Sequence, residues 1–497
     1  MYQDNHLLHR LSSVGAPDTC FATRPGAPDL SYGDLFAGAE RIAAALVANG
    51  LTPGDRVAVQ VSKSLEAVQL YLGTVMAGGI FLPLNTAYTG AELGYFFGNA
   101  TPRIVVCDPA REAEIAPLTD ATLLTLAGDG TGSLMRAAQS QSGFVAAPRG
   151  PDDLAAILYT SGTTGRSKGA MLSHANLASN SETLRQVWGF TDQDVLIHAL
   201  PIFHTHGLFV ATNVALLAGA SVHFLPGFDA DAILSAMPRA TALMGVPTFY
   251  TRLLDHPGLT HEAAANMRIF ISGSAPMLVD THEKWQATTG HTVIERYGMT
   301  ETNMNTSNPL NDPRPGTVGL PLPGVELQVM ANGVPVEPGE IGVIEVRGPN
   351  VFQGYWQMPE KTAEELRTDG WFITGDQGFQ DKDGYVTIVG REKDMVISGG
   401  FNIYPKEVES VIDDMPGVLE SAVIGVPHPD FGEAVVAVIV RDEDTITEAD
   451  VTAALSDKLA RFKQPKQMIF LAELPRNTMG KVQKKALRDT YQELFEG

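Results

Sequence analysis

The segment Tyr159-Thr-Ser-Gly-Thr-Thr-Gly-Arg-Ser-Lys-Gly169 directly follows the apolar run Ala155–Leu158. Its glycines permit tight turns and close approach of the backbone to a ligand, its hydroxyl groups supply hydrogen-bond donors, and Lys168 adds a cation. This composition predicts a loop that holds phosphate oxygens, although no Gly-Lys-Ser/Thr sequence closes it as in a P-loop. On this segment alone, a flexible surface loop of small polar residues remains the alternative.

The sequence on both sides of this loop alternates short apolar runs with helical patterns. Expected helices cover residues 65–77 and follow a capping box at Thr89-Gly-Ala-Glu92. The expected strands are residues 56–61, 81–84, 104–107, 156–159, 195–200, 242–246 and 269–272. Such alternation predicts βαβ units, mainly parallel sheets and an α/β fold.

The pattern changes after residue 377. A hairpin with Asp383-Gly384 as its turn is expected over 378–389, and the short charged run Gly390–Asp394 follows. Beyond it lie a helix that begins at Pro405, strands at 422–426, 435–440 and 468–471, and a helix at 447–459. We therefore predict a domain boundary near Lys393. The N-terminal domain would be residues 1–392, with a β-rich subdomain, and the small α/β C-terminal domain would be residues 393–497.

Length and composition restrict the class of protein. A chain of 497 residues is too long for one compact core. Its formal charge of −22 argues against a nucleic-acid or anionic-membrane surface. Two cysteines suit a reducing compartment, and the first residues lack targeting character. The apolar stretch 67–84 is interrupted by glycines and a proline, so it predicts buried helix and strand instead of a membrane span. A cytoplasmic enzyme is expected.

Further motifs follow the first loop in a fixed order. They are Ser272-Gly-Ser-Ala-Pro276, Tyr297-Gly-Met-Thr-Glu301, Gly354-Tyr-Trp356, Thr374-Gly-Asp376, Gly390-Arg391 with Asp394, and Pro475-Arg-Asn-Thr-Met-Gly-Lys481. Over roughly residues 25–490 the chain resembles the adenylate-forming superfamily of acyl-CoA synthetases, firefly luciferase and peptide adenylation domains. The resemblance implies a mobile C-terminal domain, ATP-dependent formation of an acyl-adenylate, and transfer of the acyl group to coenzyme A.

The resemblance also assigns roles to residues. It implies that Thr300 contacts the α-phosphate, that Glu301 holds Mg²⁺, and that Lys481 stabilises charge at the α-phosphorus. The resemblance further implies that His204 belongs to the shared wall of the active site and gates the acyl and CoA sides. The implied phosphate loop comprises Thr160, Ser161, Gly162, Thr163, Thr164, Gly165 and Lys168. Other implied nucleotide-binding residues are Gly273, Ser274, Ala275, Pro276, Glu295, Arg296, Tyr297, Gly298, Met299, Asp376 and Arg391. Read singly, Asp376 would be a turn residue and Lys481 a solvated lysine.

The second half-reaction requires a different arrangement of the domains. The resemblance makes Lys393 the hinge and forms the thiol tunnel from Ser398, Gly399, Gly400 and Phe401. Because family members are often inactivated by acylation of the catalytic lysine, a lysine acyltransferase or deacylase acting on Lys481 is an implied partner.

Three polar residues are candidates to face the acyl group: His206, Ser274 and Arg296. An arginine binds a carboxylate through two hydrogen bonds, whereas beside an alkyl chain it would be buried without a partner. Arg296 in the pocket therefore predicts a diacid. It could instead point outward, stack on adenine or pair with Glu295.

Several longer runs, such as 204–209, 243–249 and 295–307, resemble bacterial malonyl-CoA synthetases, which implies malonate as substrate. Methylmalonate is a possible second substrate because it adds only a methyl group. The alternatives are a short- or medium-chain monocarboxylate ligase, a non-catalytic nucleotide-binding homologue and a luciferase-like oxygenase.

Overall fold

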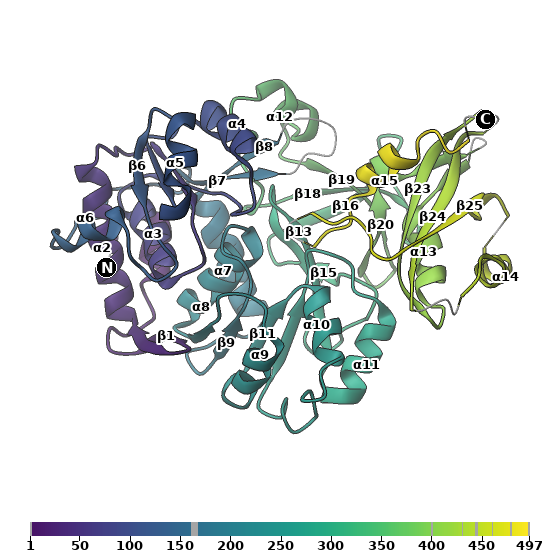
Figure 1. Ribbon diagram of the computed structural model, residues 1–497, viewed down its shortest axis with the longest axis horizontal. Helices are drawn as coiled ribbons and strands as arrows, with labels where there is room; N and C mark the ends of the chain where they lie inside the picture. Colours follow the sequence, from purple (N-terminus) through teal and green to yellow (C-terminus); the bar gives the residue numbers. More distant parts are fainter. Residues whose placement is uncertain are drawn as a thin grey trace.

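Two largely parallel sheets form the body of the N-terminal part (Figure 1). The computed structural model describes residues 2–160, 167–398, 401–429, 431–442, 446–459, 461–477 and 480–495. The first sheet has the order β6 (Thr122–Thr125), β5 (Ile104–Cys107), β3 (Arg56–Gln60), β4 (Ile80–Pro83), β7 (Leu154–Thr160) and β8 (Lys168–Ser173). Only the β7–β8 pair in it is antiparallel.

The second sheet carries most of the candidate site. Its order is β15 (Leu320–Pro321), β14 (Asn303–Ser307), β13 (Val293–Met299), β12 (Ile269–Ser272), β11 (Ala242–Gly245), β9 (Val195–His198), β10 (Ser221–Phe224), β1 (Cys20–Arg24) and β2 (Ala27–Ser31). The strands from β13 to β1 run parallel, so their carboxyl ends meet at one edge. In parallel α/β sheets, ligands bind at this edge.

Helices follow the strands as the alternating pattern predicts. The N-terminal helices are α1 (His6–Leu11), α2 (Tyr32–Ala48), α3 (Leu65–Met76), α4 (Gly90–Ala100), α5 (Glu112–Ile115), α6 (Ser133–Gln139), α7 (His174–Val187), α8 (Asn213–Ala218), α9 (Ala230–Ala236), α10 (Pro247–Leu254), α11 (Val279–Thr289) and α12 (Pro359–Glu365). The predicted capping box at Thr89 and Glu92 is confirmed at the start of α4. Among the described residues, no helix is both long and apolar enough to cross a membrane.

A third, antiparallel sheet confirms the predicted β-rich part. It comprises β17 (Val334–Pro335), β16 (Glu326–Ala331), β18 (Gly342–Arg347), β19 (Phe372–Gln380) and β20 (Val386–Arg391). The β19–β20 hairpin closes through Asp381–Gly384, and its register places Asp376 opposite Arg391.

The C-terminal sheet lies to one side of the other three (Figure 1). It has the order β22 (Phe401–Ile403), β21 (Val396–Ser398), β24 (Gly432–Arg441) and β23 (Val418–His428), and β25 (Gln467–Leu471) pairs with β24. Helices α13 (Pro405–Asp413), α14 (Glu448–Lys458) and α15 (Lys484–Tyr491) accompany it. Its buried side chains form clusters that begin at Val396, whereas the main N-terminal cluster ends at Val386.

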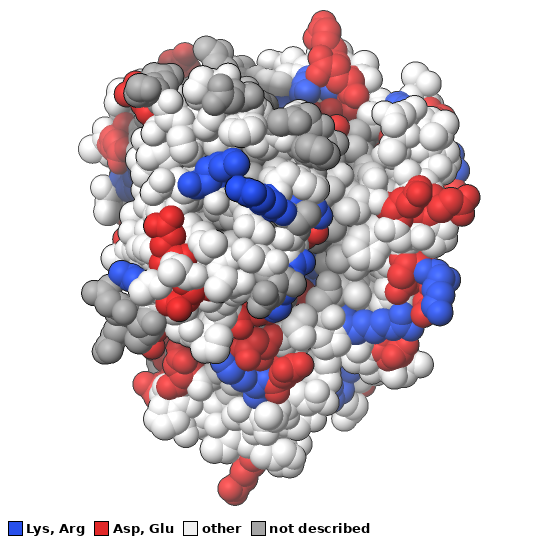
Figure 2. Space-filling view, turned by 90° about the vertical axis from the view of Figure 1, so that its right-hand side faces the viewer, with Lys and Arg blue, Asp and Glu red and all other residues white. Residues whose placement is uncertain are grey.

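Acidic and basic side chains are interspersed with uncharged ones on the face that the C-terminal part presents (Figure 2). The chain as a whole carries a formal charge of −22. The cations of the site described next therefore act locally, against an acidic background.

Candidate active site

Five of the predicted phosphate-loop residues, Ser161, Gly162, Thr163, Thr164 and Gly165, lie outside the described residues, as do Gly399 and Gly400. The two ends of the phosphate loop are described. Thr160 ends β7 and Lys168 begins β8, and the Thr160 hydroxyl donates to the Lys168 carbonyl at 3.4 Å. The antiparallel β7–β8 pair thus presents Lys168 at the base of the loop.

Lys168 is held by groups that the motif did not predict. Its ammonium group lies 3.0 Å from Glu365 at the end of α12 and 4.1 Å from the centre of the Tyr355 ring. The Tyr355 hydroxyl lies 2.5 Å from Glu365 and 2.9 Å from Glu301. Lys168 and Glu301 are therefore brought together through Tyr355, a residue inside the Gly354-Tyr-Trp356 motif, and through Glu365, which no motif marked.

Glu301 is a buried carboxylate without a direct cationic partner among the described residues. Burial raises the pKa of Glu301, partly offset by the Tyr355 hydrogen bond and the charge of Lys168. Thr300 precedes it in the turn between β13 and β14. A buried carboxylate without an ion-pair partner among the described residues, near the lysine at the base of the predicted phosphate loop, fits a divalent cation. No group of three or more His, Cys, Asp or Glu in the described ranges is arranged to hold a metal by itself.

Asp376, Arg391 and Tyr297 form a second cluster. The Tyr297 hydroxyl donates to Oδ2 of Asp376 at 2.5 Å, and Nε of Arg391 lies 2.5 Å from Oδ1. The carboxylate can still accept from ribose hydroxyls because it has about four acceptor sites. These residues come from β13, β19 and β20, so the sequence-distant nucleotide motifs converge in the fold.

The loop after β12 contains Gly273, Ser274, Ala275 and Pro276. Ser274 adopts the left-handed region with φ 71°, which costs a non-glycine residue about 1–2 kcal/mol. Glu295 connects this loop to α11: it accepts from the Met277 N–H at 3.2 Å and from His282 Nε2 at 2.8 Å. Gly298 and Met299 continue β13 beyond Tyr297.

Arg296 points into the interior. Only 4% of its surface is exposed, and its Nε and Nη2 atoms are buried without a hydrogen-bond partner among the described residues. A Cβ on Gly273 would lie 2.4 Å from the guanidinium carbon, so glycine at 273 makes room for this side chain. Desolvation lowers the pKa of Arg296 to about 9. Its sequence neighbour Glu295 is occupied by His282, so the predicted alternative of an Arg296–Glu295 pair is wrong.

Two histidines lie near Arg296. His206 begins the π-helix η3 (His206–Thr212), is 2% exposed, and has no hydrogen-bond partner for either ring nitrogen in the described part of the chain. Burial and then the charge of Arg296 lower the pKa values of His206 and His204, the latter to about 4. The His206 N–H donates to Nδ1 of His204 at 3.3 Å. The acyl candidates Arg296 and His206 are thus both buried and close enough for the Arg296 charge to act on His206, and each has side-chain nitrogens without a partner among the described residues.

Lys481 lies on a tight turn between β25 and α15. Asn477 closes this turn, because its side chain accepts from the Lys481 N–H at 2.9 Å and its N–H donates to the Lys481 carbonyl at 2.9 Å. Desolvation and the positive charge of Arg391 lower the pKa of Lys481, although the residue keeps an exposed surface. Its charge also lowers the pKa of His204. The turn of the C-terminal part therefore lies close enough to Arg391 and His204 for the charges to interact.

The remaining C-terminal candidates lie near the predicted domain boundary. Lys393 is in the short helix η5 (Glu392–Asp394) with an exposed side chain, Ser398 ends β21 with a buried one, and Phe401 begins β22. Arg488 of α15 forms an ion pair with Asp394 at 2.8 Å, so the final helix is tied to the residue after Lys393.

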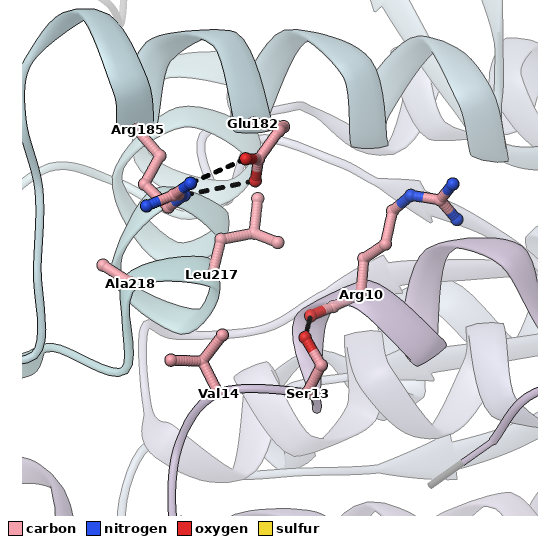
Figure 3. Close-up of a pocket in the computed structure, with 7 residues that line it drawn as sticks. All are labelled: Arg10, Ser13, Val14, Glu182, Arg185, Leu217 and Ala218. Atoms are coloured by element: carbon pink, nitrogen blue, oxygen red, sulfur yellow. Dashed lines mark hydrogen bonds and ion pairs between the residues drawn. The ribbon is translucent and has the colours of Figure 1, made fainter.

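A surface pocket lies away from all of these residues. It is lined by Arg10, Ser13, Val14, Glu182, Arg185, Leu217 and Ala218, and the Arg185 guanidinium is paired with Glu182 (Figure 3). It contains none of the predicted site residues.

Residues 15–356 match the AMP-binding enzyme family, and residues 407–481 match the AMP-binding enzyme C-terminal domain. The chain therefore belongs to the AMP-binding enzyme family. It is 60% identical to MatB from Rhodopseudomonas palustris over 99% of both chains, with a TM-score of 0.97 to the ATP-bound structure and 0.86 to the apo structure.

Relatives that are named for different acid substrates have nearly the same sequence identity to this chain. A malonate–CoA ligase of Arabidopsis thaliana is 34% identical over 98% of this chain and 91% of the relative. A feruloyl-CoA synthase of an Amycolatopsis species is 36% identical over 94% of this chain and 95% of the relative. Sequence identity at this level therefore does not indicate which acid this chain uses, and the choice has to be argued from the residues of the site.

Proposed function

We propose that this protein is an AMP-forming malonate–CoA ligase. One carboxylate of malonate attacks the α-phosphorus of ATP and pyrophosphate leaves, giving malonyl-adenylate. The thiol of coenzyme A then attacks the acyl carbon and AMP leaves, giving malonyl-CoA. The observation that carries the choice of acid is the buried guanidinium of Arg296, whose Nε and Nη2 have no hydrogen-bond partner among the residues that the structure describes.

A second carboxylate on the substrate would compensate this buried charge. Arginine binds a carboxylate through two parallel hydrogen bonds. Beside an alkyl or aromatic acid the same guanidinium would remain unpaired, at a cost of several kcal/mol. His206 adds a further buried donor or acceptor, and Ser274 a hydroxyl from the adjacent loop. Malonate is short enough to leave its reacting carboxylate near Lys481, and methylmalonate adds one methyl, worth roughly 1–3 kcal/mol of discrimination.

Adenylation needs positive charge and no general base. A carboxylic acid with an ordinary pKa near 4 is already ionised at neutral pH. Lys481 is proposed to approach the carboxylate and the α-phosphate, Thr300 to contact the same phosphate, and the Asp376–Arg391 pair to bind the ribose. Glu301 would hold a Mg²⁺ ion, which when bound neutralises phosphate charge. Glu295 acts on the nucleotide loop through Met277.

Thioester formation requires the C-terminal domain to turn. We infer domains of residues 1–392 and 393–497 with the hinge at Lys393, supported by the separate buried clusters on either side. The higher TM-score to an ATP-bound relative supports assigning the present orientation, with Lys481 near His204, to the first step. Rotation would bring Ser398, Gly399, Gly400 and Phe401 to the thiol path.

Acylation of Lys481 would remove the charge that the first step needs. The residue's exposed surface makes a modifying enzyme's access feasible. If enzymatically acetylated protein kept its adenylation rate, both this switch and the role of Lys481 would be overturned.

The proposal is tested by the products. Protein incubated with malonate, ATP, Mg²⁺ and coenzyme A should form malonyl-CoA, AMP and pyrophosphate in equal amounts, measured by chromatography and mass spectrometry. A monocarboxylate ligase would give a thioester from acetate or octanoate but none from malonate. A nucleotide-binding protein without catalysis would form no AMP with any acid.

A further inference from the structure

A partly buried lysine, Lys63, contacts His198 and lies outside every motif used above. Lys63 follows β3, and its ammonium group lies 3.1 Å from Nδ1 of His198 and donates to the His198 carbonyl at 2.8 Å. The ring of Phe224 lies 4.5 Å away. Within the described ranges, no carboxylate lies at ion-pair distance from Lys63, and burial lowers its pKa.

The contacts of His198 determine its tautomer. Nε2 of His198 lies 2.9 Å from the carbonyl oxygen of Gly207 and 3.1 Å from the Thr212 hydroxyl. A carbonyl oxygen only accepts, so Nε2 carries the proton. In the neutral ring, Nδ1 is then the acceptor for Lys63. His198 is 2% exposed and its pKa is lowered by burial and by Lys63, which keeps the ring neutral.

The hydrogen bonds that run from Lys63 through His198 to Gly207 end on η3, the helix that also carries His206. Gly207 follows His206 in the first turn of the π-helix η3, a type of helix frequent at functional sites. A Cβ on Gly207 would lie 2.0 Å from the Pro201 carbonyl oxygen, so this turn is packed closely against the loop that follows β9. His198 therefore holds the start of η3 through the Gly207 carbonyl, and the close approach of Pro201 confines the same turn.

We propose that Lys63 and His198 are positioning residues for substrate specificity: together they hold His206 beside Arg296 in the orientation that receives the distal carboxylate of the acid. The inference rests on the proposed function, since it concerns that carboxylate. The groups so placed are the ring nitrogens of His206 and the Nε and Nη2 of Arg296, which have no hydrogen-bond partner in the described part of the chain. Lys63 adds a partly buried cation on His198 and does not itself touch the substrate.

The test separates positioning from general structural support. Lys63→Met keeps a long unbranched side chain and removes the positive charge and the hydrogen-bond donors of the lysine. We expect KM for malonate to rise tenfold or more, KM for ATP to stay within twofold, and the malonate-to-acetate ratio of kcat/KM to fall tenfold. The control is Lys382→Met, on the exposed turn of the β19–β20 hairpin, which should match wild type.

Equal losses for malonate and acetate, or an unchanged malonate KM, would overturn the positioning role. Lys63→Gln keeps a donor without the charge and tests the same point if the methionine variant does not fold. We expect it to raise KM for malonate at least threefold. Wild-type protein that prefers acetate would overturn the proposed function, and this inference with it. Wild-type preference for malonate that persists in both Lys63 variants would overturn the inference alone.

Discussion

At the scale of single residues, Arg296 lowers the stability of the unliganded protein and is proposed to bind the second carboxylate of the substrate. Its guanidinium is buried, its Nε and Nη2 lack partners among the described residues, and desolvation lowers its pKa to about 9. Arg296→Met should therefore stabilise the unliganded protein by about 1–3 kcal/mol, since it removes buried donors that are unsatisfied. Calorimetric unfolding without ligands measures this, with Arg347→Met, at a partly exposed arginine paired with Glu326, as control. A lower midpoint for Arg296→Met would show that the residue is structural.

The direction of Arg296 is also where sequence reasoning stopped. The motif placed it beside Tyr297, but a side chain's direction depends on tertiary contacts such as the His282–Glu295 pair and the space above Gly273. Lys63, His198 and Glu365 carried no motif signal at all. Tyr355 lay inside a recognised motif, and only its position between Glu301 and Glu365 reveals a use.

At the scale of elements, the segment that leads into η3 should make the protein sensitive to acid. The pKa values of His198 and His206 are lowered well below 6.5, and that of His204 to about 4. At a pH between the ordinary histidine pKa of 6.5 and the lowered pKa in the folded protein, the unfolded chain binds protons that the folded protein does not. The free energy of unfolding therefore falls as pH drops from about 6.5 towards 4. Urea unfolding at pH 7.5 and 5 measures the loss. A His204→Asn, His206→Asn double variant should lose less stability. An equal loss would place the acid sensitivity elsewhere.

Helix α12 yields a prediction about ATP. Glu365 pairs with Lys168 at 3.0 Å and is a negative charge near the expected phosphates. Glu365→Gln frees the lysine and removes repulsion, so ATP should bind about two- to fivefold more tightly, the scale of a partly exposed ion pair. Calorimetric titration with Mg²⁺ and ATP measures it. Glu364→Gln, whose carboxylate pairs with Lys361 at 2.7 Å, is the matched control. Weaker ATP binding in Glu365→Gln would contradict the account.

Most helices and strands could be predicted from the sequence, whereas the π-helix η3 could not. Alternation predicted α3, β5 and β12 to within two residues of their bounds, and the capping box predicted the start of α4, because local patterns and burial agree there. The π-helix η3 was not predicted, since its widened turn is stabilised by tertiary contacts such as the His198–Gly207 hydrogen bond. That contact joins residues whose local sequence gives no sign of it.

At the scale of the whole molecule, the account requires two orientations of the C-terminal domain. Lys393→Pro would restrict the backbone at the proposed hinge. We expect thioester formation from supplied malonyl-adenylate to slow about tenfold or more, while adenylation stays within about threefold, since the present orientation already places Lys481 near His204. ATP–pyrophosphate exchange and single-turnover thioester formation measure the two steps. Equal slowing of both would locate the hinge elsewhere.

The central claim is that a diacid is selected by Arg296. The most direct measurement is AMP formation with coenzyme A across malonate, methylmalonate, succinate, acetate and octanoate, for wild type and Arg296→Met. We predict that wild type prefers malonate, with methylmalonate next. In the variant, kcat/KM for malonate should fall about 100-fold or more, the scale of a lost buried charge pair. Greater activity on acetate or octanoate, indifferent to Arg296, would contradict the malonate assignment and leave a ligase for monocarboxylic acids.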